Sequence, residues 1–133
     1  MSDAHYAGGC LCGAVRLTAR GERFRVGICH CMDCRKHHHG AVFHTFAVFP
    51  ESAVEIIGRT AAYKNRHFCP TCGSSLFGRN GDAIDIHVGC LDATSEVTPT
   101  YENWVVRREA WLPLFDLSRR YQRDREGSGR TEG

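Results

Sequence analysis

The sequence lacks any long apolar run. A membrane helix needs roughly 20 apolar residues, whereas the longest uninterrupted runs here, such as residues 46–49, are the size of a strand. The first residues form no apolar segment of the signal-peptide type, since Asp3 and His5 lie near the start. These absences predict a soluble, cytoplasmic protein that has no membrane partner.

An excess of charge of one sign is also lacking. The chain has 17 Lys and Arg against 15 Asp and Glu, a net charge of +2. Residues 118–133 contain five arginines and three acidic residues, so they account for this surplus. A body without a basic field is not expected to bind nucleic acid.

Disorder-promoting composition is confined to the end of the chain. Hydrophobic residues make up 42% and charged residues 24%, with only 4 Pro, which is typical of a globular domain. Beyond Leu117, residues 118–133 hold one aromatic side chain and many charges. We therefore expect one domain over residues 1–117 and a charged, disordered tail over 118–133. A nucleic-acid-binding arm is the alternative for the tail.

Short segments of alternating polarity fill the body. They predict a mainly β fold with one short helix over residues 33–39, which Gly40 ends in a left-handed conformation. A tight turn is expected around Cys10 and Cys12, and an apolar anchor at residues 111–115. The expected strands cover residues 15–18, 24–28, 41–49, 53–57, 60–63, 83–88 and 104–106.

Cysteine is abundant, and its spacing is informative. Seven of the 8 cysteines fall into close clusters, and the eighth, Cys90, stands alone. Disulfide partners are seldom so close in sequence because a small ring strains the bond. The clusters therefore favour metal binding over disulfides. The clustered residues are Cys10, Cys12, Cys29, Cys31, Cys34, Cys69 and Cys72.

The segment from Cys69 to Gly73, Cys-Pro-Thr-Cys-Gly, is typical of a zinc knuckle. Two thiolates three residues apart can bind one ion from a tight turn, and the glycine permits a positive φ. The alternative, a redox Cys-x-x-Cys, needs a helix after the first cysteine, and Gly-Ser-Ser at residues 73–75 is poor helix material. Cys10 and Cys12 can supply the other two ligands, because alternate residues of an extended chain face one side.

Cys29, Cys31 and Cys34 place three thiols within six residues. Three protein ligands and one open position are the usual arrangement of a catalytic zinc, so the clusters divide as four plus three. Spacing leaves open which cluster completes the knuckle. It also leaves open two structural sites, with Cys90 as a possible eighth ligand. A zinc bound by three thiolates is a soft centre, suited to a substrate's sulfur.

Several other side chains have competing interpretations. The histidines at 37–39 favour a role at the negative end of the helix over metal binding. His30, between two cysteines, is a residue that supports the metal ligands, a proton carrier or an exposed spacer, and His87 is expected to be half-buried and structural. Cys90 is more often a buried thiol than a ligand. A pocket rim and core packing explain one group equally well: Glu102, Trp104, Arg107, Arg108 and Trp111.

The three cysteine motifs in this order, with Trp111-Leu112-Pro113 near the end, resemble the glutathione-dependent formaldehyde-activating enzyme family over about residues 7–117. The domain of this family also occurs in centromere protein V. The resemblance implies a β-tent fold and a carbon–sulfur lyase that makes or splits S-hydroxymethylglutathione. It implies two zinc ions: a structural one at Cys10, Cys12, Cys69 and Cys72, and a catalytic one at Cys29, Cys31 and Cys34.

Glutathione is therefore the expected small-molecule partner. Its carboxylates need cations, for which Arg35 and Lys36 are the first candidates and Arg107 and Arg108 the next. The chain differs from the family pattern by an extra residue within 35–40, and by Glu102 where many members have histidine. The alternative function is a non-catalytic binding module stabilised by two structural zinc ions.

Overall fold

The computed structural model describes residues 4–38 and 41–126 and divides them into two compact units. Unit 1 comprises residues 4–25 and 47–98, and unit 2 comprises residues 26–38, 41–46 and 99–126. This division differs from the predicted single domain over residues 1–117. The unit boundaries lie within two strands and after residue 98. The composition does not change at these boundaries, so the sequence does not indicate them.

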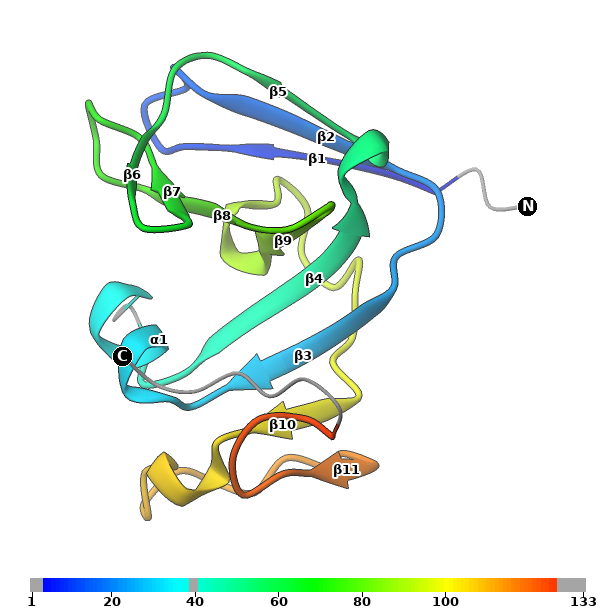
Figure 1. Ribbon diagram of the computed structural model, residues 1–133, viewed down its shortest axis with the longest axis vertical. Coiled ribbons are helices and arrows are strands. Elements are labelled where there is room, and N and C mark those ends of the chain that lie inside the picture. The colour runs from blue at the N-terminus through cyan, green and yellow to red at the C-terminus, as the bar shows by residue number, and fades with distance from the viewer. Residues whose placement is uncertain (1–3, 39–40, 127–133) are drawn as a thin grey trace. The chain divides into compact units, whose positions relative to one another are not determined.

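Unit 1 contains two antiparallel sets of strands (Figure 1). The first has the order β1-β2-β5, from β1 (His5–Gly9), β2 (Arg16–Arg20) and β5 (Val54–Ile57). The second is a meander of β6 (Ala61–Tyr63), β7 (Arg66–Phe68), β8 (Ser75–Asn80) and β9 (Ala83–His87). Two 3-10 helices belong to the same unit, η1 (Glu51–Ala53) and η2 (Val88–Cys90).

The pleat of β2 explains how unit 1 builds its core. Leu17 and Ala19 are buried between the exposed Arg16 and Arg20, as expected when alternate side chains face opposite sides of a sheet. The largest fully buried side chains of the unit come from several strands. They include Phe49, Phe77, Leu17, Leu76, Ile84 and Ile86.

Strand β1 was not predicted, because its glycines suggested a turn. Gly8 forms a bridge with Leu91, and a Cβ atom at Gly8 would lie 2.4 Å from the carbonyl oxygen of Cys90. The strand therefore needs glycine for close backbone approach and not for a turn. The tight turn predicted around Cys10 and Cys12 is present, since the amide of Gly13 donates to the carbonyl of Cys10.

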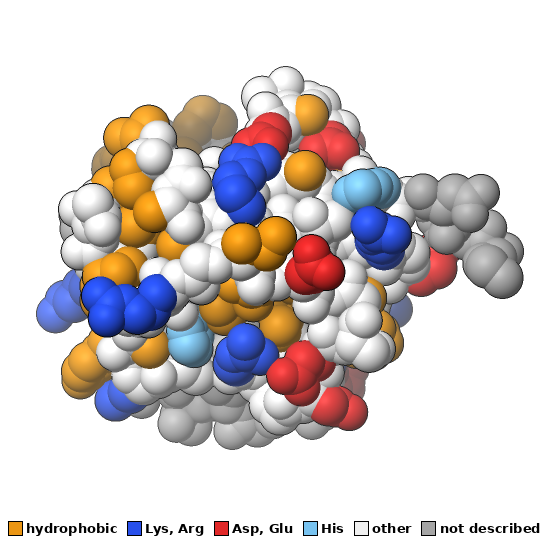
Figure 2. Space-filling view, turned by 90° about the horizontal axis from the view of Figure 1, so that it is seen from above, with side chains coloured by type: hydrophobic (Ala, Val, Ile, Leu, Met, Phe, Trp, Pro, Cys, Tyr) orange, Lys and Arg blue, Asp and Glu red, His pale blue; other side chains and the backbone are white. Residues whose placement is uncertain are grey.

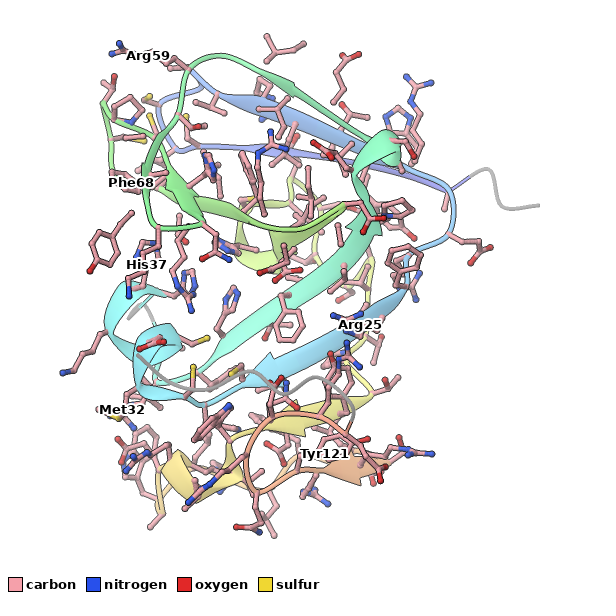
Figure 3. The ribbon with its side chains drawn as sticks, in the orientation of Figure 1. Arg25, Met32, His37, Arg59, Phe68 and Tyr121 are labelled. Atoms are coloured by element: carbon pink, nitrogen blue, oxygen red, sulfur yellow. The ribbon has the colours of Figure 1, made fainter. Side chains whose placement is uncertain are left out.

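Unit 2 is organised around three parallel strands. β10 (Tyr101–Asn103) lies between β3 (Arg25–Cys29), which enters the unit after Arg25, and β11 (Arg119–Arg120). Helix α1 (Met32–His38) follows β3, and Figure 3 shows Met32 and His37 at opposite ends of it. Strand β4 (His44–Pro50) starts in unit 2 and continues in unit 1.

Aromatic rings pack the interior of unit 2. Phe43 contacts the rings of His30 and Phe115, with centroids 5.8 and 5.3 Å away. The predicted anchor at residues 111–115 is only partly correct, since Trp111 is 69% and Leu114 77% exposed. Residues 104–106 are not a strand either. The strand lies three residues earlier, and η3 (Val105–Arg107) follows the left-handed Trp104.

The C-terminal segment is ordered as far as it is described, which differs from the expected disorder after residue 117. The amide of Tyr121 donates to the carbonyl of Glu102 at 2.9 Å, and the amide of Trp104 donates to Arg123 at 2.8 Å. These main-chain hydrogen bonds are invisible in the composition, which shows only a lack of apolar surface. Residues 127–133 lie outside the described part.

The prediction of a mainly β chain with one short helix is confirmed. In residues 4–38 and 41–126, α1 is the only α-helix, and no helix there is long and apolar enough to cross a bilayer. Figure 2 shows basic and acidic side chains interspersed on one face, which agrees with the balanced charge of residues 1–117.

Candidate functional site

The first cysteine cluster lies in unit 1, where two turns meet. Cys10 and Cys12 follow β1, and Cys69 and Cys72 follow β7. The four sulfur atoms all lie within 4.8 Å of one another. The Sγ atoms of Cys10 and Cys12 are 3.6 Å apart, and those of Cys12 and Cys69 are 3.7 Å apart. A tetrahedral zinc with bonds of about 2.3 Å would separate its sulfurs by about 3.8 Å, so this set fits zinc.

Main-chain amides around this cluster are aimed at the sulfurs. Val15 donates to the Sγ of Cys10 at 3.2 Å, and the amides of Thr71 and Cys72 donate to the Sγ of Cys69 at 3.4 and 3.5 Å. The knuckle turn closes at Gly73, whose φ of 80° favours glycine. Such donors stabilise thiolates, the form in which cysteine binds a metal.

Ser74 joins the two turns and changes the acidity of one thiol. Its hydroxyl accepts from the amide of Leu11 at 3.0 Å and lies 3.2 Å from the Sγ of Cys72. Hydrogen bonds from the Ser74 hydroxyl and amide lower the pKa of Cys72 to about 5. Cys72 is therefore a thiolate at neutral pH, ready to bind a cation.

The second cluster lies in unit 2, where β3 leads into α1. Cys29 ends the strand, Cys31 precedes the helix, and Cys34 lies in its first turn. Their three sulfurs lie within 4.8 Å of one another, and all three residues are buried. The amide of Cys34 donates to the Sγ of Cys31 at 3.4 Å.

Electrostatics in this buried cluster also favour a cation. The neighbouring thiols of Cys31 and Cys34, followed by burial, raise the pKa of Cys29 far above its usual range. Three buried thiolates repel one another, and a bound metal ion compensates their charge as they lose protons. The donor set and its burial therefore fit a thiophilic metal such as zinc.

His30 lies between two of these cysteines and is completely buried. Its Nε2 atom is 2.7 Å from a carboxylate oxygen of Glu102, which is also 0% exposed. The amide of His30 donates to the carbonyl of Asn103 at 3.1 Å. Burial lowers the pKa of His30, although the Glu102 hydrogen bond acts in the opposite direction. A neutral imidazole is consistent with the burial, and its Nε2–H can still donate the hydrogen bond to the Glu102 carboxylate.

The family model of the glutathione-dependent formaldehyde-activating enzyme matches residues 5–107, which is most of the chain. The chain belongs to this family. The recognition made from the cysteine motifs is thereby confirmed. Enzymes of the family bind zinc, and both cysteine clusters can hold a metal ion.

Two known proteins are similar to this family member. A protein of Schizosaccharomyces pombe named an uncharacterized lyase is 34% identical over 77 residues, which are 54% of this chain and 56% of the relative. The chain thus matches little more than half of that relative's length. A solved structure of a Rhodobacter sphaeroides protein is 20% identical, with a TM-score of 0.51 over 70% of this chain and 91% of that one. That likeness supports the fold alone.

The predicted cationic partners of a substrate differ in their surroundings in this family member. Arg35 forms an ion pair with Glu109 at 2.7 Å and donates to the carbonyl of Arg107. Arg108 donates to the carbonyls of Glu109 and Pro113. Two of the four predicted cations therefore already serve the protein's own structure. Lys36 and Arg107 are exposed.

The remaining predicted residues have structural surroundings. The Cys90 thiol donates to the carbonyl of Leu76 at 3.6 Å, and burial raises the pKa of this thiol to about 12. His87 is buried, with its Nδ1 atom 2.7 Å from the hydroxyl of Ser75. His37 and His38 lie in the last turn of α1, where their predicted position at the helix end is found. His39 lies outside the described residues.

Glu102 is the site residue that sequence reasoning valued too little. The sequence alone places Glu102 either at the rim of a pocket or in the core, and it gives no indication of the contact between Glu102 and His30. The available signal was a lone acidic residue in a short segment otherwise rich in aromatic residues. Only the parallel pairing of β10 with β3, between residues more than 70 positions apart, reveals its role.

Proposed function

We propose that the protein is a zinc-dependent carbon–sulfur lyase acting on a thiol adduct of glutathione, such as S-hydroxymethylglutathione. In one direction the glutathione sulfur bonds to the carbon of formaldehyde, and the thiol proton ends on the oxygen. In the other direction the same C–S bond breaks. The family membership and the lyase name of the fission yeast relative support this class of reaction.

The observation that carries the proposal is the difference in donor number between the clusters. One has four sulfurs and the other three, each set within 4.8 Å. Four protein ligands close a structural zinc site, whereas catalytic zinc sites keep three and leave one position for substrate. We therefore assign a structural zinc to Cys10, Cys12, Cys69 and Cys72, and a second zinc to Cys29, Cys31 and Cys34.

When bound by these three cysteines, zinc supplies a soft Lewis acid that prefers a sulfur ligand over water. The protein contributes the surroundings. Burial of all three cysteines keeps water away from the thiolates. Lys36 on α1 and Arg107 in η3 are exposed cations that can pair with the carboxylates of glutathione. His30 and Glu102 hold the main chain between two of the ligands.

The alternative of a binding module with two closed structural sites needs a fourth ligand for the second zinc. Cys90 was the candidate from the sequence. Its thiol donates a hydrogen bond to the carbonyl of Leu76, which Cys90 would have to give up before it could bind a metal. The group of side chains placed to share one ion consists of Cys29, Cys31 and Cys34, without Cys90. Both observations favour the lyase over the closed module.

Cobalt substitution tests the proposal directly. Each thiolate bound to Co²⁺ adds to the sulfur-to-metal charge-transfer band, so glutathione should increase the band of the substituted protein. Oxidised glutathione, which has no free thiol, should leave it unchanged. The variant Cys31→Ser should abolish the response, and the matched cysteine variant Cys90→Ser should retain it.

Exchange of formaldehyde with glutathione, followed by NMR, then tests turnover. We expect the zinc-loaded protein to accelerate the exchange above the uncatalysed rate, and Cys31→Ser to remove the acceleration. A spectrum that ignores glutathione, together with an exchange rate equal to that without protein, would contradict the lyase assignment. The binding module would then be the better description.

A further inference from the structure

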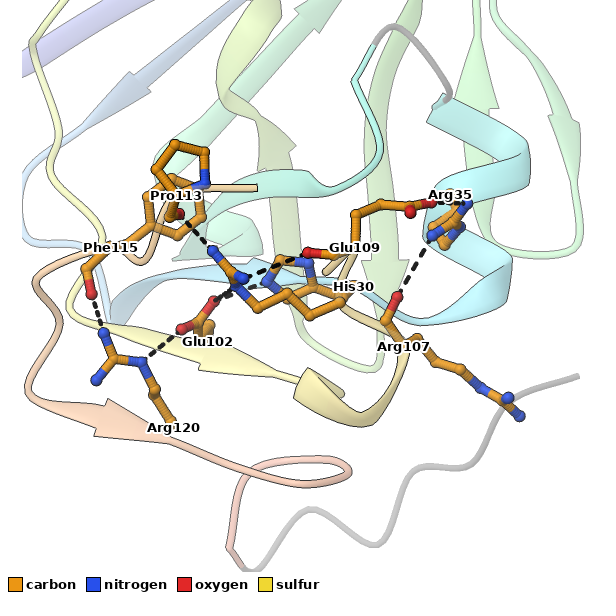
Figure 4. Close-up of polar contacts among 9 residues, drawn as sticks. His30, Arg35, Glu102, Arg107, Glu109, Pro113, Phe115 and Arg120 are labelled. Atoms are coloured by element: carbon orange, nitrogen blue, oxygen red, sulfur yellow. Dashed lines mark hydrogen bonds and ion pairs between the residues drawn. The ribbon is translucent and has the colours of Figure 1, made fainter. Parts of the chain in front are cut away.

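A buried carboxylate connects the C-terminal segment to the second cysteine cluster. Glu102 is 0% exposed, and its two oxygens lie 2.7 Å from the Nε2 of His30 and 2.8 Å from the Nε of Arg120 (Figure 4). The Nε of Arg108 is 4.0 Å away. A carboxylate removed from water needs such donors on both oxygens, so its position depends on them.

The strand register explains why these three residues meet. β10 lies between β3 and β11, and both pairings are parallel. Glu102 is paired with Ile28 on one side and with Arg120 on the other. In extended chain His30 shares the side of Ile28, whereas Cys29 and Cys31 face the opposite side. His30 thus points to Glu102 while its two neighbours point to the metal position.

We propose that Arg120 is a positioning residue for the three-cysteine cluster. Arg120 fixes Glu102, Glu102 fixes the imidazole of His30, and His30 fixes the main chain between Cys29 and Cys31. The spacing of the thiols then suits a metal ion before the ion arrives. The inference rests on the proposed function only in taking this cluster as a metal site.

Arg120 is itself held from several directions. Its guanidinium also donates to the carbonyl of Phe115, and the main chain next to it bonds to β10, where the amide of Tyr121 donates to Glu102. The amide of Val105 donates to the carbonyl of Tyr121 at 3.1 Å. A side chain anchored in this way can transmit a fixed position, although it is itself 39% exposed.

The test uses the full chain loaded with Co²⁺, without glutathione or formaldehyde. Competition with a chelator gives the affinity of each cluster, and Cys31→Ser supplies the spectrum of the four-cysteine cluster alone. Partners that orient metal ligands typically change metal affinity by about 10- to 100-fold when mutated. We expect Arg120→Gln to weaken binding at the three-cysteine cluster by that factor. The four-cysteine cluster should stay within about twofold and report that the chain is folded.

Arg119→Gln is the matched control, because Arg119 is the neighbouring arginine on β11 and has no contact with Glu102 among those described. It should leave both affinities within about twofold. Arg120→Lys should recover part of the loss, since it restores a cation beside Glu102. Unchanged affinity in Arg120→Gln, equal loss at both clusters, or equal loss in the glutamine and lysine variants would overturn the proposal.

The outcome is separable from that of the proposed function. A wild-type protein that binds the second cobalt but ignores glutathione would refute the lyase assignment, and the effect of Arg120→Gln on metal affinity would still be measurable. Conversely, full activity with glutathione and unchanged metal affinity in Arg120→Gln would refute only the positioning role.

Discussion

The two units differ in how far their clustered cysteines and ion pairs are exposed to solvent. In unit 1, Cys12 and Cys72 are exposed, and the ion pair of Arg16 with Asp92 joins side chains that are 44% and 52% exposed. In unit 2, all three clustered cysteines are buried, and so are His30 and Glu102. Unit 1 thus buries two of its four clustered cysteines, Cys10 and Cys69, whereas unit 2 buries all three of its own.

This difference supports the proposal that unit 2 performs the chemistry. Desolvating charges costs free energy, and an ion pair repays it only with good geometry. A four-ligand cluster that keeps two of its cysteines exposed gains stability from its metal at a lower desolvation cost. A buried cluster with three ligands beside a buried carboxylate contributes little net stability, because burying its charges costs free energy. Such surroundings are typical of functional sites, where the pKa values of reactive groups are shifted.

The largest expected effect separates the clusters by stability. A structural zinc contributes roughly 10–16 kcal/mol of apparent binding free energy, comparable to the whole stability of a domain at about 5–15 kcal/mol. Cys69→Ser should therefore unfold or aggregate the protein. Cys31→Ser should leave it largely folded and inactive. Circular dichroism melts and metal content would measure both, and an equal loss of Tm in the two variants would contradict the distinction.

Removing metal from the wild-type protein should show the same order. A site with three protein ligands binds zinc less tightly than a closed site with four, so a chelator titration should release the first ion from the three-cysteine cluster. Far-UV circular dichroism should change little at that step. Release of the second ion should coincide with unfolding. A single step in which both ions and the secondary structure are lost would show that the clusters are not independent.

A smaller effect is expected from truncation after Leu117. It removes Arg120 and leaves the buried Glu102 without its closest cation. Losing one partner of a buried ion pair costs about 3–5 kcal/mol, which we reduce to about 2–4 kcal/mol because Arg120 is partly exposed. The Tm should fall by roughly 5–15 °C. A chain ending at Glu126 is the control and should melt like the full chain, whereas unchanged melting of the shorter chain would favour the disordered tail.

The smallest effect concerns the exposed ion pair of unit 1. Hydrogen bonding to Arg16 lowers the pKa of Asp92 in the folded protein. The pair therefore stabilises the fold fully at a pH above the pKa of Asp92 in the unfolded chain, which is near 4. This stabilisation is lost as the pH falls through the lowered pKa of the folded protein. Arg16→Gln should give a slight loss of stability in urea titrations, constant from pH 8 to about pH 5. Adding Asp92→Asn should change little further. A loss that grows on acidification would argue against this pair as its source.

Sequence reasoning was most successful where the pattern is local. Alternation places strands near residues 16–20, 25–29 and 83–87, and cysteine spacing separates seven clustered thiols from Cys90. Spacing leaves open which cluster completes the knuckle, and the structure brings Cys10 and Cys12 to Cys69 and Cys72. It failed where distant segments decide the outcome. It does not predict β1, because the approach of Gly8 to Cys90 cannot be read from neighbouring residues.

The same limit explains the error at the C-terminal end. The composition of residues 118–126 offers little apolar surface, which predicts disorder. The segment is held instead by main-chain hydrogen bonds and by Arg120 on Glu102. Parallel pairing joins residues far apart in sequence and carries no local signature, so neither β11 nor the role of Glu102 could be predicted.

The interleaved division of the chain has a consequence for biosynthesis. All residues of unit 1 precede residue 99, and its four cysteines are translated by residue 72. Unit 2 is still incomplete at that point, because it also needs residues from Pro99 onward. The three-cysteine cluster is translated early, by residue 34, but Glu102 and Arg120 emerge much later. Because domains fold as they are synthesised, the four-cysteine cluster should be able to acquire its metal before the buried contacts of the second centre are complete.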